Sequence, residues 1–194
     1  MHTRSAALAH RASEFANREY FEQLRIDPFF IRIAQRNPDL APNVSEVIAA
    51  LRAPGEALVH GDYSPKNLLV DGAEVVILDC EVAHWGNPRF DIAFCLAHLL
   101  LKGTRRGVVS KPYIEAAQAF IASYRANGLI SALDAMLVRI TGCMLIARFE
   151  GDSPVDYREQ LDAVHIKQVA SEMIRHPADI DRAMEQYFEN ARRV

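Results

Sequence analysis

The sequence has few of the residues that mark disulfide-rich, zinc-binding or membrane proteins. Only three of its 194 residues are cysteines, and they are widely spaced with no Cys-x-x-Cys pair, which argues against a disulfide framework and a structural zinc site. We expect Cys80, Cys95 and Cys143 to be reduced and buried. No apolar run is long enough to cross a membrane, and the N-terminal residues contain no signal-peptide core. We therefore expect a cytoplasmic protein without a membrane partner.

Strong charge bias and repetition are also missing. The formal net charge is −3, and no basic run is present, so nothing favours binding to nucleic acid. We find no internal repeat and no low-complexity tract. Hydrophobic residues make up 50% of the chain, which is enough to form a core. We expect residues 1–194 to form a single domain.

One stretch, residues 58–91, carries most of the residues suited to chemistry. Its first motif, His-Gly-Asp-Tyr-Ser-Pro-Lys-Asn, occupies residues 60–67 and follows a short apolar run. Its second motif is an apolar run that ends at Asp79 and is followed closely by Glu81. We expect the predicted helices before and after this stretch to lead into it and support it.

A β-hairpin is predicted between the two motifs. Residues 68–70 and 75–78 are apolar, and Asp71-Gly72 lies between them. Asp-Gly is a strong hairpin signal, because Gly tolerates the positive φ that a tight turn needs. The spacing allows either a tight turn or a slightly longer loop.

The hairpin has a geometric consequence for the two motifs. It folds the end of its second strand back toward the start of its first, so we expect Asp79 near Asn67. Asp62, five residues before Asn67, is then held nearby on the connecting loop. Two carboxylates and an amide oxygen at a strand end suit a hard cation such as Mg²⁺.

These motifs together resemble a known group of enzymes. The pattern His-Gly-Asp-x-x-x-x-Asn, then a short hairpin, then an apolar run with Asp-x-Glu is similar to the aminoglycoside phosphotransferase and choline kinase group of small-molecule kinases. The run from Gly86 to Asp91 also matches that group. The motifs cover about a fifth of the chain, and the flanking helical pattern is compatible over nearly all of it. Three motifs in order are far more specific than any one alone.

The resemblance implies a role for each residue of the predicted site. Asp62 would orient the acceptor hydroxyl or take its proton. Asn67 and Asp79 would hold Mg²⁺ that bridges the ATP phosphates. Two roles remain open for Glu81, namely a metal ligand, direct or through water, and a residue outside the ligand set.

The resemblance also implies supporting residues and cofactors. Asp91 would brace the catalytic loop by accepting backbone N–H bonds, and His60 would help to set the conformation of this loop. Leu69 and Leu78 would lie under the adenine or beside the phosphates. Phosphoryl transfer requires mainly positioning and charge neutralisation, and carboxylates alone would repel ATP, so ATP and Mg are expected together.

Other polar residues have two interpretations each. His84 and Trp85 either face the acceptor or pack the loop, and Lys66 either contacts a phosphate or is solvated. An acidic cluster between predicted helices consists of Glu150, Asp152 and Asp156. This cluster either attracts a cationic acceptor or is a solvated loop.

Apolar periodicity and cap signals predict helices over most of the rest of the chain. The predicted ranges are 5–24, 28–35, 46–52, 92–101, 110–127, 131–149, 156–176 and 179–192. The range 92–101 is too apolar for a surface helix, so we expect it to cross the core.

The expected fold class is mainly α with a small β-hairpin, corresponding to the C-terminal lobe of a protein-kinase-like α+β fold. Nothing before Leu58 resembles the sheet, phosphate-covering loop and strand lysine of an N-terminal lobe, so we expect that lobe to be absent. We then expect weak nucleotide binding and little or no activity from this chain alone. Apolar surface exposed around the hairpin would favour a homodimer.

These motifs leave three candidate functions for the chain. The first is a kinase lobe whose longer, two-lobed form transfers the γ-phosphate of ATP to a small-molecule hydroxyl with Mg, and intact Asp62, Asn67 and Asp79 favour it. The second is a non-catalytic kinase-like module that binds a metal or a partner. The third is a metal-dependent hydrolase that uses Asp62, Asp79 and Glu81, which the lack of His-rich ligand spacing disfavours. The sequence does not identify the acceptor.

Overall fold

The computed structural model describes residues 1–72 and 74–191, and most of these are helical. The α-helices are α1 (His2–Ala6), α2 (Glu19–Phe21), α3 (Arg32–Arg36), α4 (Ala41–Arg52), α5 (Arg89–Gly103), α6 (Lys111–Asn127), α7 (Ala135–Glu150), α8 (Ala163–Arg175) and α9 (Ile180–Ala191). The strands are β1 (Ala57–Val59), β2 (Leu68–Asp71), β3 (Glu74–Ile77) and β4 (His84–Gly86). Short 3₁₀ turns are η1 (Ala9–Phe15), η3 (Pro65–Asn67), η4 (Arg105–Gly107), η5 (Ile130–Ala132) and η6 (Arg158–Gln160), and η2 (Glu22–Ile31) is a π-helix.

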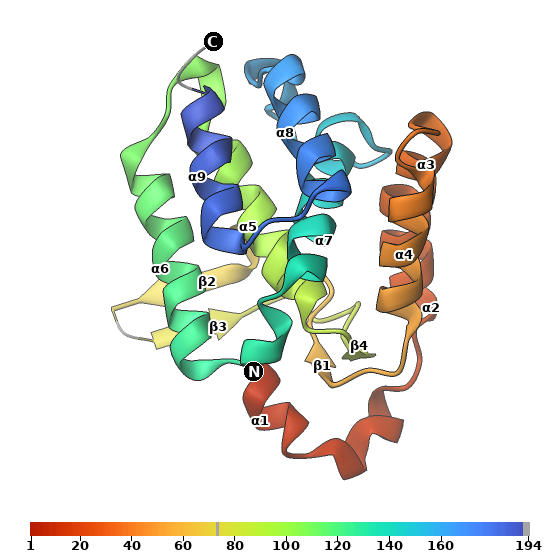
Figure 1. Ribbon diagram of the computed structural model, residues 1–194. Coiled ribbons are helices and arrows are strands. Elements are labelled where there is room, and N and C mark those ends of the chain that lie inside the picture. Colours follow the sequence, from red (N-terminus) through yellow and green to blue (C-terminus); the bar gives the residue numbers. More distant parts are fainter. Residues whose placement is uncertain (73, 192–194) are drawn as a thin grey trace.

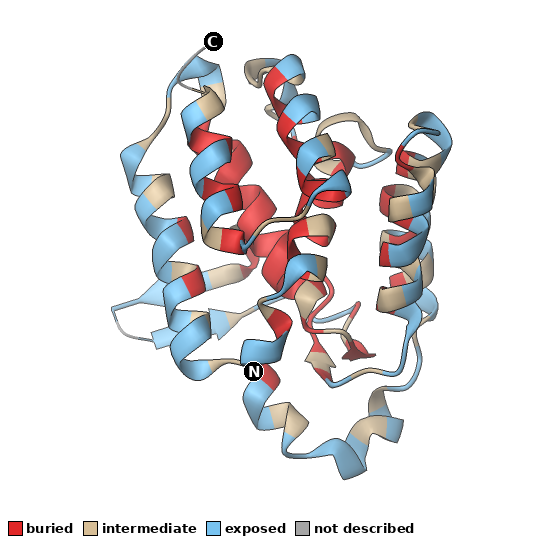
Figure 2. Ribbon diagram, in the orientation of Figure 1, coloured by how far each residue is buried: buried red, intermediate tan, exposed pale blue. Residues whose placement is uncertain are grey.

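Helices α5 and α7 form the centre of the molecule, with α6 and α9 on one side and α3 and α4 on the other (Figure 1). Nearly every residue of α5 is buried, as its apolar sequence predicts (Figure 2). The first turn of this central helix lies directly after β4, so the core fixes the position of the polar loops near its start. In the described part of the chain, no helix combines the length and the apolar character needed to cross a bilayer.

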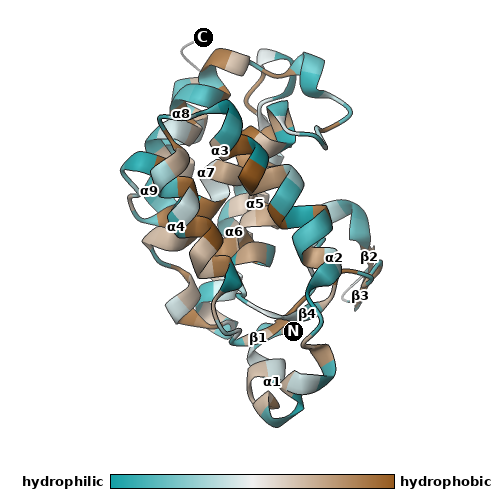
Figure 3. Cartoon of the chain, turned by 90° about the vertical axis from the view of Figure 1, so that its right-hand side faces the viewer, coloured by the Kyte–Doolittle hydropathy of each residue, from teal (hydrophilic) through white to brown (hydrophobic). Residues whose placement is uncertain are grey.

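The strands form two small antiparallel sheets. The predicted hairpin is confirmed: β2 pairs with β3, with Leu68 opposite Ile77 and Asp71 opposite Glu74. Strand β1 pairs with β4, so that Ala57 is opposite Gly86, and this second pairing was not predicted. The hairpin projects from the edge of the helical body in both views (Figures 1 and 3). The apolar residues of the hairpin are therefore largely exposed.

The helix predicted to start at Pro28 is wrong. Residues 19–36 form one continuous helical stretch in which Pro28 lies inside the π-helix η2. Proline lacks an N–H and breaks the regular α-helical ladder, but a π-helix already departs from that ladder. The predicted single helix over residues 5–24 is also wrong, because η1 and an irregular segment separate α1 from α2.

The predicted starts of two other helices were wrong, because each helix begins at a residue other than the one that the cap signals indicated. Helix α4 begins at Ala41 with a proline in its first turn, whereas Ser45 lies inside the helix and its hydroxyl donates to the Ala41 carbonyl at 2.8 Å. Helix α8 begins only at Ala163, where the Asp162 side chain accepts the backbone N–H of His165 at 3.0 Å.

The remaining helices agree with the predicted ranges to within a few residues. Helix α7 is capped by Asp134, whose side chain accepts from Leu137 N at 3.1 Å, and not by the predicted Ser131. Helix α6 follows Ser110 and ends before Gly128, as predicted. The predicted end of the last helix, Arg192, lies outside the described residues.

The cysteines are free, but only two of them are buried as expected. Burial raises the pKa of both Cys95 and Cys143 to about 12, which keeps these thiols protonated and unreactive. Cys80 is exposed, because it lies in the loop that follows the projecting strand β3. The expectation of three buried thiols was therefore wrong at this position.

Candidate functional site

The loop that carries the first motif begins where β1 ends. Gly61 has φ +80°, and a Cβ at this position would lie 2.8 Å from Val82, so the tight turn needs glycine. The turn reverses the chain between His60 and Asp62, and both of these side chains are buried. The local sequence thus places the Asp62 carboxylate inside the molecule and not in solvent.

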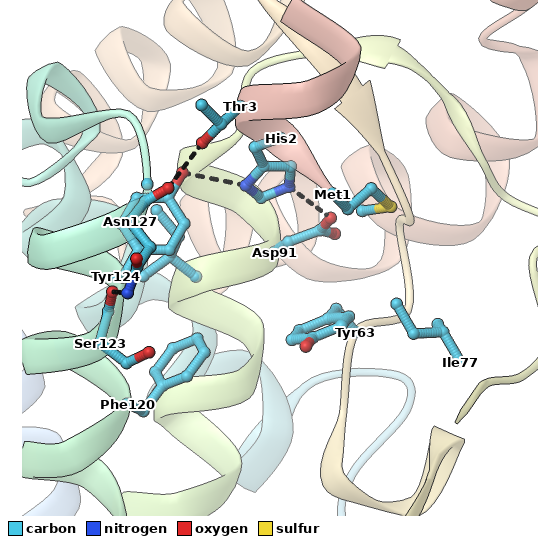
Figure 4. A pocket seen from close by; sticks show the side chains of 12 residues that line it. Met1, His2, Thr3, Tyr63, Ile77, Asp91, Phe120, Ser123, Tyr124 and Asn127 are labelled. Carbon is cyan, nitrogen blue, oxygen red and sulfur yellow. Dashed lines mark hydrogen bonds and ion pairs between the residues drawn. The ribbon is translucent and has the colours of Figure 1, made fainter. Parts of the chain in front are cut away.

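Asp91 holds this loop in place from the first turn of α5. The Asp91 carboxylate is 1% exposed and accepts the backbone N–H of His60 at 2.7 Å and that of Gly61 at 2.9 Å. One of its oxygens also lies 3.0 Å from Nε2 of His2, whose other ring nitrogen lies 3.0 Å from the Tyr124 hydroxyl (Figure 4). These are the backbone contacts that the resemblance implied for Asp91.

His60 connects the loop to the end of the hairpin. Its Nδ1 accepts the backbone N–H of Asp62 at 3.1 Å, so its Nε2 carries the proton and donates to the Leu78 carbonyl at 2.9 Å. Leu78, the residue before Asp79, is therefore bonded to His60, which lies two positions before Asp62. Leu78 N also donates to the Asn67 carbonyl at 2.9 Å, which continues the hairpin ladder toward Asp79.

Asp62 and Asn67 are in direct contact. The Asn67 amide donates to the Asp62 carboxylate at 2.8 Å and to the Asp62 backbone carbonyl at 2.9 Å. Both residues are buried, and Lys66 lies 3.6 Å from the same carboxylate. The loop therefore presents one oriented carboxylate together with one amide.

Arg25 is a residue of this site that the sequence did not reveal. Its guanidinium lies 3.2 Å from the Asp62 carboxylate and donates to the Gly61 carbonyl at 2.6 Å. Burial lowers the pKa of Arg25, and the charges of Asp62, Glu81 and Asp79 oppose that shift. One cation is thus shared by the carboxylates of both motifs. The only sequence signal was a cation within a largely apolar helical stretch.

Asp79 and Glu81 differ from Asp62 in being exposed. Asp79 has φ +64°, a left-handed conformation that aspartate tolerates better than most residues. Among the described residues, no group of three or more His, Cys, Asp and Glu side chains is arranged to hold a metal ion. A cation held by Asn67 and Asp79 would therefore need oxygens from phosphate or water to complete its shell.

The two predicted cofactor-contacting leucines lie at the surface. Leu69 is 56% exposed in the middle of β2, and Leu78 is 39% exposed just beyond β3. Val76 lies opposite Leu69 in the ladder and is also exposed. The hairpin therefore offers apolar surface next to the Asn67 and Asp79 end of the site.

His84 and Trp85 pack the loop and do not line the site. His84 is 1% exposed, its Nδ1 donates to the Val82 carbonyl at 3.0 Å, and its ring lies 4.1 Å from that of Phe21. Burial lowers the pKa of His84, which keeps the ring neutral. The Trp85 indole donates to the Gly55 carbonyl at 2.9 Å. Of the two interpretations, loop packing is the one that these contacts support.

The acidic cluster is largely neutralised by nearby basic side chains. Asp152 pairs with Arg32 at 2.8 Å and with Arg36 at 2.5 Å, and Glu150 pairs with Lys167 at 2.7 Å. Asp156 pairs with no basic side chain among the described residues, whereas Glu150 and Asp152 form ion pairs that join the end of α7 and the loop after it to α3 and α8. These two carboxylates therefore offer little to a cationic ligand.

Comparison with known protein families agrees with this geometry. Residues 3–130, about two thirds of the chain, match the model of a family described as the phosphotransferase enzyme family. The matched range contains every predicted site residue from His60 to Asp91. No curated protein matches the chain.

Proposed function

The chain belongs to the phosphotransferase enzyme family, and from this premise we propose that it transfers the γ-phosphate of ATP to a hydroxyl group of a small molecule in a Mg²⁺-dependent reaction, with low turnover when residues 1–194 act alone. The observation that carries the proposal is the buried Asp62–Asn67 pair, joined at 2.8 Å and braced by Asp91. A single fixed carboxylate beside an amide is what phosphoryl transfer to a hydroxyl needs from a protein, because the reaction depends on positioning more than on covalent chemistry.

Asp62 acts on the acceptor. Its carboxylate is held by Asn67 on one side and by Arg25 on the other, so its orientation is fixed before a ligand arrives. It orients the acceptor hydroxyl toward the γ-phosphate or accepts the hydroxyl proton as the new bond forms. His60 and Asp91 hold the backbone of the loop and do not touch the acceptor.

Asn67 and Asp79 would hold the metal ion, and Glu81, whose charge acts on Arg25 as that of Asp79 does, is a further candidate ligand. The Asn67 nitrogen donates to Asp62, which leaves its amide oxygen for a cation. Carboxylate and amide oxygens fit Mg²⁺, which commonly uses one or two carboxylates together with phosphate oxygens. Bound Mg²⁺ would neutralise phosphate charge during transfer. Leu69 and Leu78 would offer exposed apolar surface under the adenine or beside the phosphates.

The proposal is tested by measuring phosphate transfer from Mg·ATP to a panel of hydroxyl compounds. Asp62→Asn should reduce turnover about 10²- to 10⁴-fold, the usual contribution of a positioned acid–base group, with Mg·ATP affinity retained. Asp79→Asn should abolish Mg²⁺-dependent turnover, and EDTA should do the same to the unchanged protein. Asp71→Asn, the same change at an exposed hairpin position, is the matched control and should be silent.

Two outcomes would contradict the proposal. Unchanged turnover of Asp79→Asn would remove the metal role of that residue. If the folded protein binds no Mg·ATP and transfers no phosphate to any acceptor, the chain is a binding module of the family and not an enzyme.

A further inference from the structure

A cavity of about 480 Å³ lies beside the catalytic loop, on the side of residues 64–66. The loop forms one wall, and α5 forms another with His98 and Lys102. Arg148 at the end of α7 and Tyr157 in the following loop close the cavity. Lys66 lines the cavity and lies 3.6 Å from the Asp62 carboxylate, so the cavity adjoins the carboxylate that we assign to the acceptor. The wall made by Arg148 and Tyr157 lies outside the range that matches the family model.

The cavity is strongly basic. Four cations line it, whereas Asp156 is the one carboxylate among its lining residues in the described part of the chain. The four cations are Lys66, Lys102, Arg105 and Arg148. Lys66 pairs with Asp62, but Lys102 and Arg105 take part in none of the salt bridges formed within residues 1–72 and 74–191. Positive charge therefore accumulates here without a matching number of carboxylates.

The cavity also contains polar atoms that the described protein leaves without partners. Five buried side-chain atoms among the described residues lack a hydrogen-bond partner, and four of them belong to residues that line this cavity. The four atoms are Ser64 Oγ, His98 Nε2, Arg148 Nε and Tyr157 Oη. Ser64 is fully buried and His98 is 6% exposed. Buried polar groups without partners are rare in folded proteins, so four at one place indicate a ligand.

The protonation states of these groups favour a ligand that accepts hydrogen bonds. Burial raises the pKa of Tyr157 to about 12, so its hydroxyl remains a donor. Burial, together with the charges of Arg148, Lys102 and Lys66, lowers the pKa of His98 to about 3, so its ring is neutral. The Ser64 hydroxyl and the Arg148 Nε–H are further donors.

We propose that the acceptor carries a phosphate or carboxylate group, which binds in this cavity between Lys102, Arg105 and Arg148 while the acceptor hydroxyl faces Asp62. This inference rests on the proposed function and specifies its substrate class. Oxyanions satisfy several N–H and O–H donors at once and are attracted by unpaired cations. Choline and aminoglycosides carry positive charge, and a cavity with this excess of cations repels them.

Binding is tested by calorimetry on the full chain without ATP, at fixed ionic strength. The probes are glycerol 3-phosphate, D-glycerate, glycerol and choline. We expect one of the anionic probes to bind at least about tenfold more tightly than glycerol, and choline not to bind. Tighter binding of glycerol 3-phosphate assigns a phosphate to the acceptor, and tighter binding of D-glycerate assigns a carboxylate. Equal binding of glycerol and both anions would overturn the inference.

A pair of lysine variants locates the binding site. Lys102→Gln should weaken binding of the preferred anion about tenfold, because a charge-assisted contact is lost. Lys111→Gln makes the same change at an exposed lysine that pairs with Glu115 outside the cavity, and should leave the affinity unchanged. Circular dichroism confirms that both variants are folded. Unchanged affinity of folded Lys102→Gln, or equal losses in both variants, would contradict the assignment.

Transfer assays separate this inference from the function on which it rests. If the anionic probes bind but no phosphate is transferred from Mg·ATP to any acceptor, the proposed function fails and only the anion site stands. If phosphate is transferred to choline or glycerol in preference to the anionic probes, the proposed function stands and this inference fails. Transfer to an anionic probe, lost together with its affinity in Lys102→Gln, supports both.

Discussion

The loop over residues 60–67 and the hairpin segment over residues 68–81 carry the two halves of the proposed site, yet they are held very differently. In the loop, Asp62 and Asn67 are buried and bonded to each other and to neighbouring elements. In the hairpin segment, Asp79 and the strand residues are largely exposed. The proposed acceptor side is therefore organised by the fold itself, whereas the described residues leave the proposed nucleotide side exposed.

The difference follows from where each segment is anchored. The loop is fixed to the first turn of α5, the most buried helix, through the carboxylate of Asp91. The hairpin is fixed mainly by its own ladder and by the His60 contact to Leu78. A two-stranded hairpin has little stability of its own, so its geometry depends on contacts at its base.

The largest effect on stability should come from breaking the anchor of the loop. Asp91→Ala removes the acceptor of two buried backbone N–H groups, and we expect the free energy of unfolding to fall by about 2–5 kcal/mol. Urea unfolding followed by circular dichroism measures this loss. Asp71→Ala, a matched change on the exposed hairpin strand, should cost no more than about 0.5 kcal/mol. Equal losses would show that the two segments are not anchored differently.

An effect of intermediate size, a dependence of stability on pH, should arise from His98, which lies on the side of the loop over residues 60–67. Its pKa is lowered to about 3 by burial and by nearby cations, and an unfolded histidine titrates near about 6.5. Between these values the unfolded chain binds more protons, so stability falls as the pH is lowered from about 7 toward 4, by up to about 1.4 kcal/mol per pH unit from this residue. His98→Gln should flatten that slope.

Urea unfolding at several pH values, without added anions, provides the measurement. His176→Gln, at an exposed position, serves as the control and should retain the slope of the unchanged protein. A slope in His98→Gln as steep as that of the unchanged protein would show that His98 does not contribute to it.

The smallest effect on stability should come from a substitution on the exposed surface of the hairpin. Val70 is 67% exposed on β2, and Val70→Thr should change the free energy of unfolding by less than about 0.5 kcal/mol. Val138→Thr, the same substitution at a fully buried position of α7, should cost about 1–3 kcal/mol because it buries a hydroxyl. Thermal and urea unfolding of both variants compare the two regions directly. A large loss from Val70→Thr would mean that another surface covers the hairpin in solution.

The parts of the site that could be predicted are those with local signals. Asp71-Gly72 identifies the hairpin by turn chemistry alone, and the apolar run after Asp91 identifies the central helix. The contact between Asp62 and Asn67 spans only five residues of one loop. In each case, residues close in sequence determine the geometry.

The parts that could not be predicted depend on contacts between distant segments. Arg25 meets Asp62 from a π-helix, and no local pattern marks either the helix type or the direction of that side chain. Strand β4 is three residues long and forms only because it pairs with β1. Asp156 and Asp162 are both of a residue type that caps helices. Tertiary packing decides that Asp162 is the one that caps α8.

The position of the Arg25 charge beside Asp62 depends on the number of residues in the π-helix η2. A helix turns by about 100° per residue, so removing one residue between Arg25 and Phe29 would rotate Arg25, together with the buried Phe21, relative to Phe29 and the core. The loss of a single residue in this segment would thus separate the guanidinium from the Asp62 carboxylate, which it approaches to 3.2 Å.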